Sequence, residues 1–213
     1  MMLKLAPALL TGFVAMGGWA VVTVKDLPEY FVAGQQYTIE FQVRQHGRTL
    51  LSGLRPQLVI ESAATRDVVI PAVARSAEGT YAVTFTAPTA GQVQFTIRSG
   101  FGNSELRLYP QTVVAVGGSR PAMAARDRGQ MLFVAKGCNT CHSNIDLVDR
   151  PDNQAALTVG PELGGRHLAR EYVMQKVKNP ASQIMPDLGL SDSEASAIAA
   201  FLSGEPAATA GGR

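Results

Sequence analysis

The spacing of hydrophobic residues changes once along this chain, and the change divides the sequence into two structural units. Between about residues 20 and 116 apolar side chains occur at every second position, as in Ile39, Phe41 and Val43. This period predicts β-strands that each bury one face. From about residue 125 onward the apolar residues follow helical spacing instead. We therefore expect an all-β domain followed by an all-α domain.

The first unit has the pattern of a small sandwich of two antiparallel sheets. Residues 81–85 and 93–97 repeat the alternation, and turn-forming residues separate the runs, for example at 88–91. About seven short strands at this spacing predict a β-sandwich. The segment resembles the immunoglobulin-like domains of the FixH and YtkA type, most clearly over residues 79–100. This resemblance implies an immunoglobulin-like fold.

The sequence of the β-unit contains little that suggests chemistry of its own. From Lys25 to Val116 it has no cysteine, no methionine and a single histidine, His46, so copper carriage is poorly supported. We expect a spacer or docking module that holds the second unit near a partner.

The second unit has three helical segments after a short linker. Residues 125–136 and 166–178 have the spacing of amphipathic helices. Ser191, followed by Glu194, forms a capping-box pattern that predicts the start of a third helix, which ends before Gly204. The expected organisation is a leader at 1–19, a β-domain at 20–116, a linker at 117–124, a helical domain at 125–204 and a flexible tail at 205–213.

The N-terminal residues have the pattern of an export signal. Lys4 precedes an uncharged, mostly apolar stretch from residue 5 to residue 24, and small residues at 15–17 and 18–20 fit a cleavage site. An uncleaved membrane anchor is the alternative, because about twenty apolar residues are enough to cross a bilayer. Residues 20–24 also fit a first β-strand. Either way, the sequence predicts a periplasmic or extracytoplasmic location, with membrane association through residues 5–24 if the segment is kept.

The charge of the chain argues against a nucleic-acid partner. The 19 Lys and Arg residues nearly balance the 17 Asp and Glu residues, which leaves a formal net charge of +2. No basic run alternates with aromatic residues, so the usual features of a nucleic-acid-binding surface are missing from the sequence.

The two cysteines of the chain, Cys138 and Cys141, stand in a Cys-x-x-Cys-His motif with His142. This motif is the attachment signal for c-type haem. Two thiols at this spacing can bond to two vinyl groups of one haem, and the adjacent imidazole then reaches the iron. The sequence therefore predicts one covalently attached haem c.

Three other interpretations of the motif fit the sequence less well. A disulfide across so short a loop would be strained and would stabilise little. A thioredoxin-like redox pair is expected in a βαβ context, whereas this motif follows a helix. A structural zinc site needs further ligands, and the chain has no other cysteine.

From about residue 125 to 204 the chain resembles class I cytochromes c. Gly129 and Phe133 on the first helix, with Ile198 and Phe201 on the last, match a helix crossing of that family. The resemblance implies an all-α cytochrome c fold around one haem. A polar insertion at 143–158 departs from the family pattern and leaves the surface at the haem edge uncertain.

The resemblance also implies roles for residues outside the motif. Gly160-Pro161 matches a pair whose proline carbonyl holds the Nδ1 proton of the proximal histidine, here His142. Met185, in a loop before the last helix, matches the sixth iron ligand, so the predicted metal ligands are His142 and Met185. The apolar residues expected to line the haem pocket are Leu163, Val177, Ile184, Leu188, Leu190, Ile198 and Leu202.

Together these features predict an electron carrier rather than an enzyme. The expected partners are a redox donor and a redox acceptor, either free or within a membrane respiratory or photosynthetic complex. Two alternatives stay open. One is a haem sensor or peroxidase-like enzyme whose sixth position opens, and the other is an interaction protein in which the cysteines form a disulfide.

Overall fold

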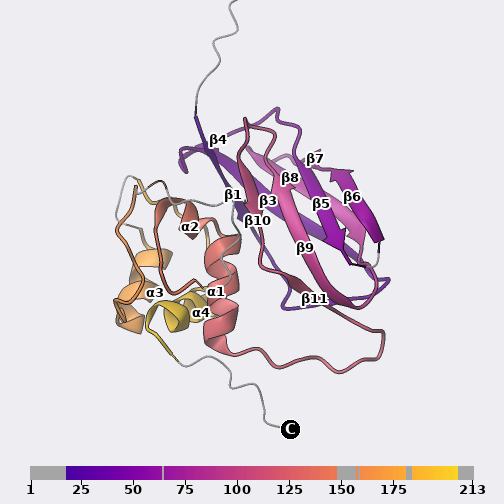
Figure 1. The fold of residues 1–213 in the computed structure, drawn as a ribbon. Coiled ribbons are helices and arrows are strands. Elements are labelled where there is room, and N and C mark those ends of the chain that lie inside the picture. The colour runs from indigo at the N-terminus through magenta and orange to yellow at the C-terminus, as the bar shows by residue number, and fades with distance from the viewer. Residues whose placement is uncertain (1–17, 64, 148–156, 158, 181–183, 206–213) are drawn as a thin grey trace, which may run out of the picture.

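The computed structural model describes residues 18–63, 65–147, 157, 159–180 and 184–205. Most of the leader, much of the predicted polar insertion and the tail from residue 206 lie outside these ranges. Figure 1 shows strands gathered on one side of the molecule and helices on the other. Each part is built from a continuous stretch of the chain.

Two sheets form the β-part, and the order of their strands is that of a sandwich. One contains β1 (Ala20–Val24), β3 (Gln36–Gln45), β8 (Thr80–Thr86) and β7 (Val73–Ala74) in that order, with β4 (Thr49–Leu50) beside β3. The other contains β2 (Phe31–Val32), β11 (Gln111–Val114), β9 (Gly91–Arg98), β5 (Gln57–Ser62) and β6 (Thr65–Pro71), with β10 (Glu105–Arg107) beside β9. All pairings are antiparallel except that of β2 with β11.

Aromatic side chains from both sheets meet in the core of the sandwich. The ring centroid of Phe95 in β9 lies 5.2 Å from that of Phe31, which belongs to the same sheet. It also lies 5.2 Å from that of Phe85, which belongs to the other sheet. Phe31 and Phe95 are 0% exposed. The strands predicted from residues 37–44, 81–85 and 93–97 are confirmed. Seven of the described strands have four or more residues, which agrees with the predicted number, although the sequence patterns did not locate the β5–β6 hairpin. The four strands of two or three residues were not predicted.

The described residues of the second part form four helices: α1 (Ala125–Ala135), α2 (Cys138–Cys141), α3 (Arg170–Lys178) and α4 (Asp192–Leu202). The predicted crossing of α1 with α4 is confirmed. A Cβ added at Gly129 would overlap the carbonyl oxygen of Ala197, and the rings of Phe133 and Phe201 lie 5.6 Å apart. The capping box of Ser191 and Glu194 is present at the start of α4.

The second predicted helix is shorter than expected, because α3 begins at Arg170 rather than at residue 166. His167 has a φ of 45°, which a right-handed helix cannot accommodate. The backbone N–H of Leu168 donates instead to the carbonyl of Leu202 at 3.0 Å. This hydrogen bond ties the segment before α3 to the end of α4.

The N-terminal apolar stretch is only partly described. Its last residues, Ala20–Val24, form β1, as the strand interpretation of that segment predicted. Within the described ranges, no helix has the length and apolar character needed to span a membrane.

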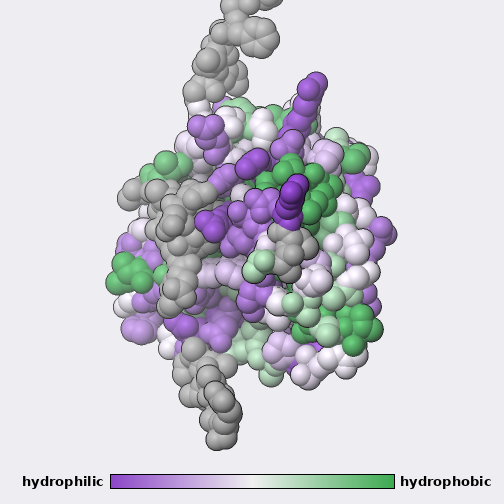
Figure 2. All heavy atoms as spheres, turned by 45° about the vertical axis from the view of Figure 1, so that its right-hand side comes forward, coloured by the Kyte–Doolittle hydropathy of each residue, from purple (hydrophilic) through white to green (hydrophobic). Residues whose placement is uncertain are grey.

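Hydrophobic and polar residues are mixed over the face of the molecule shown in Figure 2. On the edge strands β6 and β7 of the sandwich, Val68, Val69 and Val73 are exposed.

Candidate functional site

The Cys-x-x-Cys-His motif sits on a short helix that begins directly after α1. Gly137 joins the two helices with a φ of 76°, and a Cβ at this position would lie 2.9 Å from the carbonyl oxygen of Val22. Glycine is therefore needed for both its conformation and its close packing on β1. Cys138 and Cys141 are three residues apart on α2 and share one face, while the N–H of His142 donates to the Cys138 carbonyl at 2.9 Å.

The two cysteines are free thiols with little tendency to ionise. Burial, followed by the nearby Cys141, raises the pKa of Cys138 to about 12. Burial also raises the pKa of Cys141. Reactive redox cysteines have lowered pKa values, so these environments do not favour thioredoxin-like chemistry.

The ring of His142 is held by the segment that contains Pro161. The carbonyl of Pro161 lies 2.9 Å from Nδ1 of His142, which is the contact implied by the cytochrome resemblance. Gly160 packs on the same ring, since a Cβ there would lie 2.5 Å from Nδ1. With Nδ1 engaged as the donor, Nε2 is the ring nitrogen available to a metal.

Residues 160–165 run alongside the motif and brace it. The N–H of Gly160 donates to the carbonyl of Cys141, and that of Leu163 donates to the carbonyl of Ser143, both at 2.9 Å. Gly164 permits this close approach, because a Cβ there would lie 2.8 Å from Oδ1 of Asn144. Leu163 is thereby placed close to the motif, where it is half-buried.

Met185 lies in the irregular segment between α3 and α4, where it is half-buried and packs against the hydrophobic core. Of the apolar residues predicted to line a haem pocket, Val177, Leu190, Ile198 and Leu202 are buried, and Leu163 and Leu188 are half-buried. Ile184 is the exception, with 52% of its surface exposed.

The described donors fit a c-type haem. Two thiols share a face of one helical turn, and the imidazole beside them has Nε2 available. The half-buried thioether of Met185 is a suitable axial ligand in chemical terms. Large apolar side chains are exposed near the motif and Met185, including Ile145 at 80% and Ile184 at 52%. An apolar porphyrin ring would suit such surroundings.

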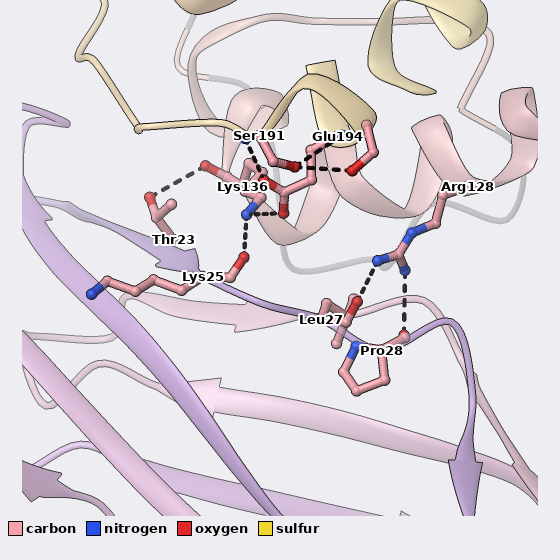
Figure 3. A network of polar contacts seen from close by, with 9 residues as sticks. Thr23, Lys25, Leu27, Pro28, Arg128, Lys136, Ser191 and Glu194 are labelled. Carbon is pink, nitrogen blue, oxygen red and sulfur yellow. Dashed lines mark hydrogen bonds and ion pairs between the residues drawn. The ribbon is translucent and has the colours of Figure 1, made fainter. Parts of the chain in front are cut away.

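A polar network that sequence reasoning missed joins this site to the sandwich (Figure 3). Lys136, the residue before Gly137, is 3% exposed and its Nζ pairs with Glu194 at 2.5 Å. The same ammonium donates to the carbonyl of Lys25, and the hydroxyl of Thr23 donates to the carbonyl of Lys136 at 3.3 Å. The attachment turn is thus bonded to β1 and to the residue that follows it, and the side chain of Lys136 also links the turn to the start of α4.

A second contact of the same kind lies further along α1. The guanidinium of Arg128 donates to the backbone carbonyls of Leu27 and Pro28, the latter at 3.3 Å (Figure 3). Every residue carries a backbone carbonyl, so residue types do not indicate which carbonyls accept hydrogen bonds from a distant side chain. These contacts could therefore not be predicted from the sequence.

Comparison with known proteins gives a family match in the helical part. Residues 124–202 match the family model described as cytochrome C oxidase, cbb3-type, subunit III. No curated protein matches the sequence significantly.

Solved structures show looser likenesses. The filamin domain of Lin-41 aligns with 45% of this chain and 90% of its own length at 20% identity, with a TM-score of 0.36. A superoxide reductase (neelaredoxin) from Ignicoccus hospitalis aligns with 44% of this chain and 82% of its own length, also at 20% identity, with a TM-score of 0.32. The Escherichia coli adhesin FdeC aligns with 45% of this chain and 31% of its own length at 18% identity, with a TM-score of 0.34.

The family match covers less than half of the chain and coincides with α1 to α4. It supports a C-terminal cytochrome c domain and, with it, a c-type haem used for electron transfer.

Proposed function

We propose that this chain is an extracytoplasmic c-type cytochrome that carries single electrons between protein partners through one haem c ligated by His142 and Met185. When bound, haem c supplies an iron that alternates between the ferrous and ferric states. One electron enters from a donor and one leaves to an acceptor, so no bond in a substrate is made or broken.

The contact between Pro161 and His142 is the single observation that most favours this proposal. The carbonyl lies 2.9 Å from Nδ1, so it fixes the orientation of the ring and the nitrogen that faces the metal. Neither a disulfide nor a thioredoxin-like pair requires such a contact. The family match over residues 124–202 supports the same conclusion independently.

Each site residue has a defined task in the proposal. Cys138 and Cys141 would hold the porphyrin through thioether bonds, and His142, whose ring is braced by Pro161, would ligate the iron. The thioether of Met185 would be the second protein ligand of the iron, and it would favour the ferrous state and exclude other ligands. Leu163, beside the motif, keeps water away from the ring.

Membership of a respiratory complex is part of the proposal. The matching family is described as a subunit of a cbb3-type cytochrome c oxidase, which supports a respiratory donor or acceptor for this chain. We further propose that the apolar N-terminal residues direct export and, if they are retained, tether the protein to the membrane.

The test is a spectrum of the purified protein, produced with a working haem-maturation system. We expect thioether-bound haem that stays on the denatured chain, and in the oxidised protein the weak long-wavelength band of sulfur-to-iron charge transfer. Met185→Ala should abolish that band and let carbon monoxide bind the reduced protein. Met174→Leu, in α3, is the matched control and should leave both properties unchanged.

Two results would contradict the proposal. A colourless chain of unmodified mass would reject haem attachment altogether. Rapid carbon monoxide binding by the unmodified protein at neutral pH would favour the sensor or peroxidase-like alternative, because it would indicate an open sixth position.

A further inference from the structure

The sandwich contacts the segment that carries the Cys-x-x-Cys-His motif and lines a cavity together with the segment that carries Met185. On the side of the motif, Gly137 packs against β1, and Thr23 donates to the carbonyl of Lys136. On the side of Met185, residues from both parts line one cavity of about 530 Å³. These contacts place the sandwich where it can affect the coordination of the iron.

The cavity lies between the sandwich and the segment that follows Met185. The sandwich contributes Lys25, Asp26, Gln42 and Arg44. The helical part contributes Lys136, Asp187–Gly189, Ser191 and Glu194. The lining thus includes residues two to four positions beyond Met185.

Arg44 of β3 stands out within this lining. It is 7% exposed, and its Nη2 donates to Oε1 of Gln42 at 2.5 Å. Its Nη1 is buried and has no hydrogen-bond partner among the described residues. A buried guanidinium nitrogen without a partner is costly, so an anionic group nearby is expected to offset the cost.

The other two cations of the cavity already have partners. The ammonium of Lys136 pairs with Glu194 at 2.5 Å, and that of Lys25 pairs with Glu40. Arg44 is therefore the cation that is best able to attract a further negative charge.

Asp187 is the carboxylate best placed to respond. It lines the same cavity as Arg44, and its charge raises the pKa of Arg44, opposing the larger lowering caused by burial. No ion pair within 4.0 Å joins the two side chains in the described structure, so the attraction acts across the cavity. A free anion is a poorer candidate, because Asp26 and Glu194 also line the cavity and would repel it.

Asp187 also shapes the segment that carries Met185. Its Oδ1 accepts from the N–H of Gly189 at 2.9 Å, and Gly189 has a φ of 61°. A force on this carboxylate is therefore transmitted to the backbone two residues after Met185, at Asp187 itself, and four residues after it, at Gly189.

We infer that Arg44 of the sandwich is a positioning residue that attracts Asp187 and so holds Met185 in place as the axial ligand. The inference rests on the proposed function, since it assigns a task to the sandwich at the same haem. In this inference the sandwich is more than a spacer, because it helps to keep the sixth coordination position of the iron closed to other ligands.

The experiment measures how easily an external ligand displaces Met185. Imidazole is titrated into the oxidised full-length haem protein and followed by the loss of the sulfur-to-iron band. Arg44→Gln is expected to bind imidazole on the order of tenfold more tightly than the unmodified protein, because the loop opens more readily. Because Asp187 is exposed, Asp187→Asn should fold normally. We expect it to tighten imidazole binding by a similar factor. The double variant should resemble either single variant, since the two side chains act as a pair.

Arg98→Gln, on β9 of the sandwich, is the matched control and should bind imidazole like the unmodified protein. Amide hydrogen exchange of residues 184–190 in the full-length haem protein is a second readout, and Arg44→Gln and Asp187→Asn should each accelerate it. This readout separates the two proposals, because it tests the brace even if the spectrum shows that Met185 is not the ligand.

Three outcomes would overturn the inference. The first is an unchanged imidazole affinity and unchanged hydrogen exchange in Asp187→Asn. The second is a double variant in which the effects of Arg44→Gln and Asp187→Asn on the free energy of imidazole binding simply add. The third is slower exchange of residues 184–190 on adding inorganic phosphate, with no effect of Asp187→Asn, because it would show that Arg44 serves a free anion.

Discussion

Single residues at this site are constrained mainly by close backbone contacts. Gly129, Gly137 and Gly160 all lie where a Cβ would meet another part of the chain. The family resemblance marked Gly129 and Gly160, because both belong to known pairings. The close packing of Gly137 could not be predicted, because its contact partner in β1 is more than a hundred residues away in the sequence.

Replacing Gly129 by alanine tests the helix crossing. The new methyl group would overlap the carbonyl oxygen of Ala197 and would lie 2.9 Å from Cβ of Phe201, so α1 and α4 must separate. We expect a loss of stability of about 1–3 kcal/mol, as for other overpacked cores. The midpoint of urea denaturation measures it. Gln175→Ala, at an exposed position of α3, should cause no loss, and an unchanged midpoint for Gly129→Ala would contradict the tight crossing.

The raised pKa of Cys138 predicts slow thiol chemistry in the haem-free protein. With a pKa of about 12, its thiolate fraction at pH 8 is about a thousandfold below that of an unfolded cysteine. Alkylation by iodoacetamide, followed by mass spectrometry, should therefore modify Cys138 far more slowly in the folded chain than in denaturant. Equal rates in the two states would show that the thiol is not buried.

The same shift has a consequence for stability at high pH. Because the folded pKa of Cys138 is raised above the unfolded value, its contribution is complete below about pH 8.5 and is lost as pH rises toward 12. The haem-free protein should thus lose stability across this window, and Cys138→Ala should lose less.

At the scale of elements, local signals predicted strands and helix starts well. The capping box at Ser191 and the alternating strands are sequence patterns that depend on near neighbours only. The late start of α3 could not be foreseen, because it depends on the φ of His167 and on a hydrogen bond from Leu168 to Leu202. The β5–β6 hairpin was missed although its strands contain runs of aliphatic residues.

Loss of the capping box should weaken α4 and the cavity beside it. The hydroxyl of Ser191 accepts from the N–H of Glu194 at 3.2 Å, and the Glu194 carboxylate accepts from the N–H of Ser191 at 3.1 Å. Ser191→Ala should cost about 1 kcal/mol in the free energy of unfolding, measured by chemical denaturation. Ser193→Ala removes a hydroxyl that lies 3.0 Å from Oγ of Ser191 but leaves both hydrogen bonds of the capping box in place. A cost for Ser193→Ala equal to that for Ser191→Ala would show that capping is not the cause.

At the scale of the whole molecule, the change of hydrophobic period predicted the two parts but not how they meet. The sequence suggested a spacer or docking module joined by a linker, whereas the structure shows buried polar contacts between the parts. The side chains of Arg128 and Lys136 donate to backbone carbonyls that follow β1, and Thr23 of β1 donates to the carbonyl of Lys136. Residue types alone cannot reveal such pairs, because every residue except proline carries the same backbone groups.

The coupling of the two parts leads to a final prediction about unfolding. Arg128 donates from α1 to the carbonyls of Leu27 and Pro28, and its removal would leave both acceptors without that donor. We expect the unmodified haem-free protein to unfold in one transition, with the fluorescence of Trp19, which precedes β1, and the far-UV circular dichroism of the helices changing together. Arg128→Ala should lower the midpoint by an amount equivalent to about 1–3 kcal/mol and separate the two signals, because a hydrogen-bonded charge between the parts is lost.

Arg98→Ala should leave the signals coincident. Separate transitions in the unmodified protein would mean that the interface does not couple the parts, and the brace inferred for Arg44 would then lack its mechanical basis.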